Sequence, residues 1–95
     1  LAPNIIVAEP SELIGTGVAV GHEYVSACLQ MVRSINPEII VLPSAGISCG
    51  EDCYNIIRAG ADASGSSSGI CCASDREAMA EEMIAAVRRA WNETH

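Results

Sequence analysis

The sequence of 95 residues predicts an α/β fold in which parallel strands carry covering helices. Two short runs, residues 4–8 and 38–42, are apolar without alternation, which is typical of strands buried on both faces of a parallel sheet. The segments between and after them show apolar residues at helical spacing instead. A chain of this length makes one small domain, which we expect to span residues 1–95.

The first strand, residues 4–8, leads into a loop over residues 10–21 and then into a helix over residues 23–35. Pro37 ends this helix, because the residue before a proline is disfavoured in the helical region. The helix has one apolar face, made by Val25, Cys28, Leu29 and Val32.

The second strand, residues 38–42, is followed by a short helix over residues 49–59. Ser48 and Glu51 have the spacing of a capping box, in which each side chain accepts a hydrogen bond from the backbone N–H of the other residue. Gly60 stands where a glycine is expected to end the helix.

Residues 61–68 carry mainly serine, glycine and alanine where a strand would need larger apolar residues. We therefore expect a weak strand or a loop in this segment. A last helix over residues 75–91 follows, with Ser74 and Glu77 as a second capping-box pair. Its apolar face is made by Ala80, Met83, Ile84, Val87 and Trp91.

The chain is acidic, with a formal net charge of -7 from five arginines against twelve aspartates and glutamates. Nucleic acids and anionic membrane surfaces are bound by clustered Lys and Arg, so we expect neither as a partner. We also expect no membrane-spanning segment, because no apolar run approaches the necessary length.

Five cysteines, an odd number without a C-x-x-C pair, do not match the even set of a secreted disulfide framework. They indicate a reducing compartment, and we expect the protein in the cytoplasm. Cys49 and Cys53 lie one helical turn apart and could share a metal ion, but no nearby histidine completes a tetrahedral site. We interpret all five as small buried hydrophobes and expect no cofactor. They are Cys28, Cys49, Cys53, Cys71 and Cys72.

Glu9 directly follows the first strand, and Pro10 fixes the next backbone angle before the glycine-bounded loop. A carboxylate at the tip of a buried strand, with a closable loop behind it, is how a protein can hold a general base. The segment from Ile5 to Gly17 resembles the catalytic-glutamate and lid region of triosephosphate isomerase, in its archaeal form.

Three further segments resemble this family in the same order. Residues 33–42 are similar to the helix end and strand that follow the lid, residues 45–52 to the seventh-strand phosphate loop, and residues 60–69 to the eighth strand and its loop. The resemblance implies a partial, half TIM barrel of about three βα units from the C-terminal part of the family. A complete barrel needs roughly 200 to 250 residues.

The resemblance also implies a site. Glu9 would be the former catalytic base, and a phosphate would be held mostly by backbone N–H groups. In the family the close approach of one loop depends on a glycine, and Ser44 stands at that position here. The implied phosphate-binding residues are Ile14, Gly15, Gly46, Ser67 and Ser68.

Other catalytic groups of the family are missing. Its lysine and its electrophilic histidine lie in segments outside the resemblance, and this chain contains no lysine at all. His22 could be imagined as a substitute electrophile, but we expect it at a helix start, facing solvent. We therefore expect a chain that does not isomerise triose phosphates alone and retains weak phosphate binding. The alternative is an active aldose–ketose isomerase of glyceraldehyde 3-phosphate and dihydroxyacetone phosphate, with Glu9 as base, in an oligomer or with a complementary chain.

An open half-barrel leaves unpaired strand edges and an apolar inner face, which includes Ile5, Val7, Ile40 and Leu42. Such edges and faces recruit another copy of the chain. We expect a homodimer that apposes the two inner faces, with residues 64–68 free to follow a path unlike that of the family.

Overall fold

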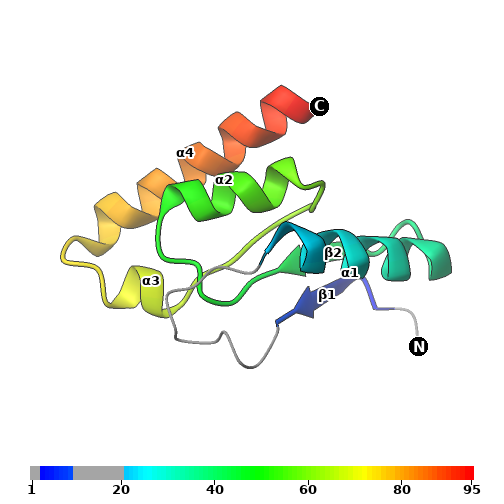
Figure 1. Ribbon diagram of the computed structural model, residues 1–95. Coiled ribbons are helices and arrows are strands. Elements are labelled where there is room, and N and C mark those ends of the chain that lie inside the picture. The colour runs from blue at the N-terminus through cyan, green and yellow to red at the C-terminus, as the bar shows by residue number, and fades with distance from the viewer. Residues whose placement is uncertain (1–2, 10–20) are drawn as a thin grey trace.

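The computed structural model describes residues 3–9 and 21–95 (Figure 1). Within these ranges two strands alternate with helices along the chain, as expected for an α/β fold. The elements are β1 (Ile5–Ala8), α1 (His22–Ile35), β2 (Ile40–Pro43), α2 (Gly50–Arg58), α3 (Ser68–Cys71) and α4 (Arg76–Thr94). Both strands and the three longer helices overlap the predicted segments, whereas α3 lies where the sequence predicts no helix.

β1 and β2 pair in parallel, with Ile5 opposite Ile40 and Val7 opposite Leu42. The helices cover one face of this two-stranded sheet, where Val41 is fully buried. On the other face Ile5, Val7 and Ile40 are exposed by 52%, 57% and 42%. The prediction of strands buried on both faces is therefore wrong for this chain by itself, because the described residues supply no second covering layer.

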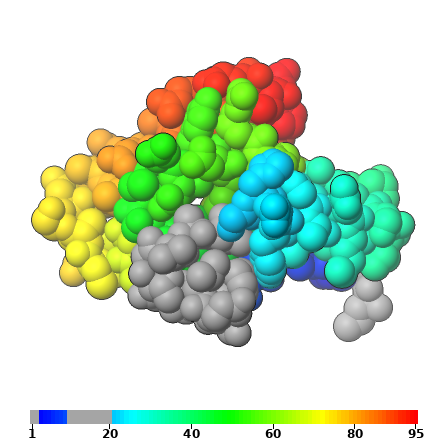
Figure 2. All heavy atoms as spheres, in the orientation of Figure 1, coloured from blue at the N-terminus to red at the C-terminus, as the bar shows by residue number. Residues whose placement is uncertain are grey.

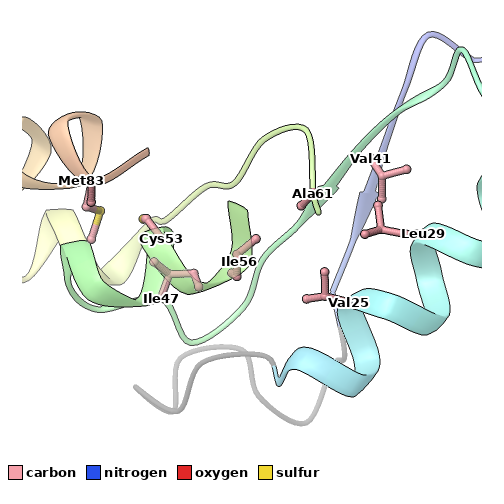
Figure 3. Close-up of a cluster of buried hydrophobic side chains, with 9 residues drawn as sticks. Val25, Leu29, Val41, Ile47, Cys53, Ile56, Ala61 and Met83 are labelled. Atoms are coloured by element: carbon pink, nitrogen blue, oxygen red, sulfur yellow. The ribbon is translucent and has the colours of Figure 1, made fainter. Parts of the chain in front are cut away.

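The core extends from β2 and α1, with Val41, Val25 and Leu29, to the contact between α2 and α4, where Cys53 and Met83 lie (Figure 3). α2 packs along α4, and α1 covers β2. Fully burying an aliphatic side chain contributes roughly 1.5–3 kcal/mol, and the two isoleucines Ile56 and Ile57 are almost completely buried. The core cluster is aliphatic and sulfur-containing, and its members are Val25, Leu29, Val41, Ile47, Cys53, Ile56, Ala61, Met83 and Ala86.

Both predicted capping boxes are wrong in detail. The Ser48 N–H and hydroxyl donate to the carboxylate of Asp52, at 2.9 and 3.1 Å, and Glu51 does not take part. α4 is capped by Asp75, whose carboxylate accepts from the N–H of Ala78 at 3.0 Å, and not by Ser74. At α4 the carboxylate of Asp75 is a stronger acceptor than a serine hydroxyl and is favoured by the helix dipole.

The end of α2 follows the sequence prediction. Gly60 has a φ of +109°, a conformation that favours glycine, and its N–H donates to the carbonyl of Ile57 at 3.0 Å. α1 begins at His22, which is exposed as expected. No helix in the described part of the chain is long and apolar enough to cross a membrane.

Residues 61–67 form a loop that runs beside β2, and the structure has no third strand there. One backbone hydrogen bond and two side-chain hydrogen bonds replace part of the missing strand pairing. The N–H of Asp62 donates to the carbonyl of Val41 at 3.3 Å, and the Asp62 carboxylate accepts from the N–H of Val41 at 3.2 Å. The Ser64 hydroxyl donates to the carbonyl of Pro43 at 3.3 Å. Small polar residues thus follow the strand edge without adding to the sheet.

The five cysteines are free thiols. Cys53 is buried, and Cys28 and Cys49 are partly buried, but Cys71 and Cys72 are exposed at the end of α3. The interpretation of all five as buried hydrophobes is therefore wrong for that adjacent pair, because the short α3 ends at the surface. Across residues 3–9 and 21–95, no three His, Cys, Asp or Glu side chains are grouped to hold a metal ion.

Candidate functional site

The candidate site lies at the carboxyl ends of β1 and β2, where the connections of a parallel sheet gather. The N–H of Ser44 donates to the carbonyl of Ala8 at 3.0 Å, which extends the strand pairing by one step. This extension brings Glu9 beside Ser44. The Ser44 hydroxyl donates to Oε1 of Glu9 at 2.6 Å, while Ser44 itself is buried and Glu9 is exposed at the end of its strand.

The chain turns sharply after Ser44. Ala45 has a φ of +99° and Gly46 a φ of +69°. Glycine adopts such angles freely, but for alanine they cost about 1–2 kcal/mol. Ala45 is buried, so its surroundings hold the strained backbone in place. Strain of this kind clusters at functional sites.

A third segment, residues 65–68, closes the other side of the site. The Ser66 hydroxyl donates to the carbonyl of Ile47 at 2.8 Å and ties the two loops together. Gly69 lies so close to this loop that an added Cβ would collide with the carbonyl oxygen of Ile47 and lie 3.0 Å from Cα of Ser48. The absence of a side chain at Gly69 therefore permits the start of α3 to approach the turn after β2.

These three segments enclose an open pocket of about 230 Å³. Val7 and Leu42 form its apolar floor, and Glu9 is the ionisable side chain in the described part of its lining. Ser67 is the N-cap of α3 and Ser68 its first residue, so their N–H groups have no intrahelical partner. The pocket thus combines one carboxylate with serine hydroxyls and backbone amides.

Four of the residues singled out from the sequence line this one pocket, namely Glu9, Gly46, Ser67 and Ser68. Ile14 and Gly15 lie outside the described residues, as does the expected loop over residues 10–21 except for its last residue. Sequence reasoning missed the contact of Ser44 with Glu9. The pairing of the two strands could have predicted this contact. Ala8 pairs with Pro43, so the residues that follow, Glu9 and Ser44, lie side by side.

A second hollow, of about 340 Å³, lies between α2, α4 and residues 64–66. Its lining is mostly apolar and includes Cys53 and Met83. Burial, followed by the charge of Asp52, raises the pKa of the Cys53 thiol to about 11. A thiol that stays protonated at neutral pH is a poor nucleophile, so this hollow offers no reactive group.

Comparison with known proteins identifies relatives by sequence, although no family model matches the chain. A triosephosphate isomerase of Methanothermus fervidus is 37% identical over 87 residues, and that of Methanosarcina mazei is 41% identical over 87 residues. Each match covers 88% of this chain and 39% of the relative. The triosephosphate isomerase of Sulfolobus acidocaldarius is 36% identical over 86 residues, or 88% of this chain and 37% of the relative.

A solved structure shares the fold. One chain in the crystal structure of the Amycolatopsis orientalis BexX/CysO complex superposes with a TM-score of 0.73 over 94% of this chain and 34% of that one. The two sequences are 17% identical, so the similarity concerns the fold alone.

The sequence matches confirm the resemblance that the motifs predict. They run over nearly the whole of this chain but only about 39% of each relative, at 36–41% identity. The chain is therefore similar in sequence to one part of the archaeal triosephosphate isomerases.

Proposed function

We propose that this chain binds a small phosphorylated anion in the pocket at the ends of β1 and β2, and that it does not isomerise triose phosphates by itself. The observation that supports this proposal is the set of residues that line one pocket. A single pocket of about 230 Å³ brings Glu9 together with Gly46, Ser67 and Ser68, residues that the family resemblance selects from three distant parts of the sequence.

Backbone amides would supply the anion binding. The N–H groups of Ser67 and Ser68 are unused by α3, and amides at such positions carry partial positive charge. The described lining of the pocket contains no Arg or His side chain, and Glu9 adds a negative charge at its edge. Binding is therefore expected to be weak and to weaken further with salt.

Isomerisation needs a cation or an electrophile in addition to a base. A positioned base contributes roughly 10² to 10⁴-fold, but the negative charge that develops during isomerisation must also be stabilised by a cation or an electrophile. The chain has no lysine, and the described pocket lining supplies no cation. Glu9 alone is therefore insufficient for isomerisation.

An NMR titration tests the binding. Inorganic phosphate and phosphoglycolate should shift the amide signals of Gly46, Ser67 and Ser68 together. Ser68→Ala keeps the N–H and should retain binding, whereas Ser68→Asp places a second carboxylate at the pocket and should abolish it. Millimolar ligand that moves none of these signals would refute the proposed function.

A second candidate function is an active triose phosphate isomerase with Glu9 as base, assembled from several copies or completed by another chain. The placement of Glu9 favours it, because the Ser44 hydroxyl holds one carboxylate oxygen at 2.6 Å beside the pocket. Turnover of glyceraldehyde 3-phosphate by the wild type and by Glu9→Gln separates the two functions. We expect equal background rates, and turnover lost only in Glu9→Gln would establish the enzyme.

The third part of the proposal concerns assembly. The exposed Ile5, Val7 and Ile40 lie on the sheet face opposite the helices, as the inner face of a half-barrel would. Barrel interiors are packed with side chains, and hiding such aliphatic surface contributes roughly 25 cal/mol per Å². A second copy that covers this face would form a homodimer. The five free thiols favour a reducing compartment such as the cytoplasm for it.

A further inference from the structure

Cys71 and Cys72 are the two exposed residues among the five cysteines of the chain. They are adjacent in the sequence at the end of α3, and both are free thiols. In Figure 2 the yellow atoms of the segment around α3 lie at the surface, at one end of the molecule. Small molecules in solution can therefore reach this pair of thiols.

The peptide unit that joins the two cysteines is held at both of its polar atoms. The carbonyl of Cys71 accepts from Nε of Arg76 at 3.0 Å. The N–H of Cys72 donates to the carbonyl of Ser68 at 2.8 Å. The N–H of Cys71 donates in the same way to the carbonyl of Ser67, also at 2.8 Å. These bonds form the turn of α3, so they couple the conformation of the cysteine pair to that of the two serines.

This helical conformation keeps the two sulfur atoms apart. Consecutive side chains of a helix do not face each other. Consecutive Cα atoms lie about 3.8 Å apart across a trans peptide, whereas disulfides usually join Cα atoms about 4.4–6.8 Å apart. A bond between the two sulfurs therefore requires the peptide unit to leave its helical conformation, which breaks its hydrogen bonds to Arg76 and Ser68.

α3 connects the cysteine pair to the pocket at the ends of β1 and β2. Ser67 and Ser68, one helical turn before the cysteines, line that pocket. Gly69 lies against the turn after β2, where a Cβ would collide with the carbonyl oxygen of Ile47. Because the packing is so close, opening α3 would displace its first residues from this turn and change the pocket.

We propose that Cys71 and Cys72 form a reversible disulfide with each other, and that this bond opens α3 and weakens anion binding in the pocket. The effect on anion binding rests on the proposed function, whereas the bond and the opening of α3 do not. By linkage, an anion that binds the closed form of α3 should oppose oxidation by the same factor.

The oxidant is a disulfide of low molecular weight. The thiolate of one cysteine attacks a sulfur of the oxidant, breaks its S–S bond and releases the first small thiolate. The second cysteine then attacks the sulfur of the first and releases the other small thiolate. The two cysteines lose two electrons, which reduce the disulfide of the oxidant, and their two protons end on the two released thiols.

The disulfide between adjacent cysteines should be easy to reduce. Departure from ordinary geometry makes a disulfide more reducible, and strained or exposed disulfides are the labile, regulatory ones. The dithiol is therefore the resting form in a reducing compartment. The disulfide forms when the ratio of oxidised to reduced small thiols rises.

Mixtures of oxidised and reduced glutathione test the bond in the full chain. After alkylation of the remaining thiols, mass spectrometry should locate a bridge between Cys71 and Cys72 that lowers the mass by two hydrogen atoms. The amide signals of Ser68 and Cys72 should shift in NMR spectra on oxidation and return on reduction. A mixed disulfide with glutathione in place of the bridge, or a bridge that leaves these signals unchanged, overturns the proposal.

Arg76 provides a second test, because its side chain holds the peptide unit of the dithiol form. Arg76→Met removes one hydrogen bond that oxidation must break, so the equilibrium constant for oxidation should rise about threefold. Arg88→Met is the matched control, since it removes the same charge from an exposed position elsewhere on α4 and should leave this constant unchanged. Equal constants for the two variants would contradict the role of the peptide unit.

Titration with inorganic phosphate tests the effect on the pocket. The dissociation constant of the disulfide form should exceed that of the dithiol form by about fivefold or more. A variant that combines Cys71→Ser and Cys72→Ser should bind equally before and after oxidation, whereas Cys28→Ser should behave as the wild type. A bridge that leaves phosphate affinity unchanged refutes the effect on binding. A dithiol form that binds no phosphate refutes the proposed function instead, and the mass and amide signals still decide whether the bond forms and opens α3.

Discussion

The α2–α4 pair and the β1–β2 sheet differ in how completely they are packed. Ile56 and Ile57 of α2 and Met83 of α4 are buried. In the sheet, by contrast, only one face is covered, and Ile5 and Val7 face outward. The helix pair is stabilised by contacts within the chain, whereas the sheet leaves apolar side chains exposed on one face.

Polar contacts reinforce the helix pair. The carboxylate of Glu82 in α4 accepts from the N–H of Gly50 at 2.6 Å, so a residue of one helix caps the start of the other. An added Cβ at Gly50 would lie 2.8 Å from Cγ of Glu82, which shows how closely the elements approach. At the other end the Tyr54 hydroxyl donates to Glu93 at 2.5 Å, and the guanidinium of Arg89 lies 4.4 Å from the centre of the Tyr54 ring. No comparable side-chain bond ties the described part of β1 to the helices.

The largest expected loss of stability comes from a substitution in the α2–α4 helix pair. Ile57→Ala should lower the free energy of unfolding by about 2–5 kcal/mol, because it leaves a cavity in a fully buried site. Ile5→Ala removes the same atoms from an exposed position and should cost less than about 1 kcal/mol below the concentration at which the chain associates. Urea unfolding of both variants measures the contrast, and equal losses would show that the two regions are packed alike.

A smaller loss of stability is expected at Gly69, where α3 approaches the turn after β2. Gly69→Ala should destabilise the chain by about 1–3 kcal/mol, because its Cβ would collide with backbone atoms of Ile47 and Ser48. Gly65→Ala is the matched control, since its Cβ would meet only Cδ2 of Leu42, at 3.6 Å. Thermal melts of the two variants compare them, and a Gly69→Ala chain as stable as the control would contradict the close approach of α3.

The pH dependence of stability should reflect the buried thiol between α2 and α4. The folded-state pKa of Cys53 is raised from 9.0 to about 11, chiefly by burial. The folded state therefore favours the neutral thiol, and this contribution is fully present below pH 9 and is lost as the pH rises through 11. The loss should be on the order of 2 kcal/mol.

Comparison with Cys53→Ala isolates this effect from the other groups that titrate in the same range. The variant lacks the thiol, so its free energy of unfolding should fall less steeply between pH 9 and 11. Parallel curves for the two proteins would show that burial does not perturb Cys53.

Periodicity and glycine placement predict much of this fold. The spacing of Val25 and Leu29 predicts α1, and Gly60 does end α2. The caps are less predictable, since Ser74 and Asp75 are both good capping residues and adjacent in the sequence, and the structure is needed to show that Asp75 caps α4. α3 has four residues, too few for any periodicity to appear in the sequence.

For the site, the family motifs select residues that the structure brings to one pocket, although motifs say nothing of their mutual contacts. The hydrogen bond from Ser44 to Glu9 depends on the strand register, and the strain at Ala45 depends on how the turn packs. The exposure of Ile5 and Val7 could not be inferred from their sequence alone, because the same residues would suit a strand buried on both faces.

Binding without catalysis is the central claim, and one NMR sample of the chain with dihydroxyacetone phosphate tests it most directly. The amide signals of Gly46, Ser67 and Ser68 should shift, while no glyceraldehyde 3-phosphate forms beyond the level seen with Glu9→Gln. Product that forms only with the wild type would contradict the absence of catalysis, and amide signals that stay in place would contradict the binding.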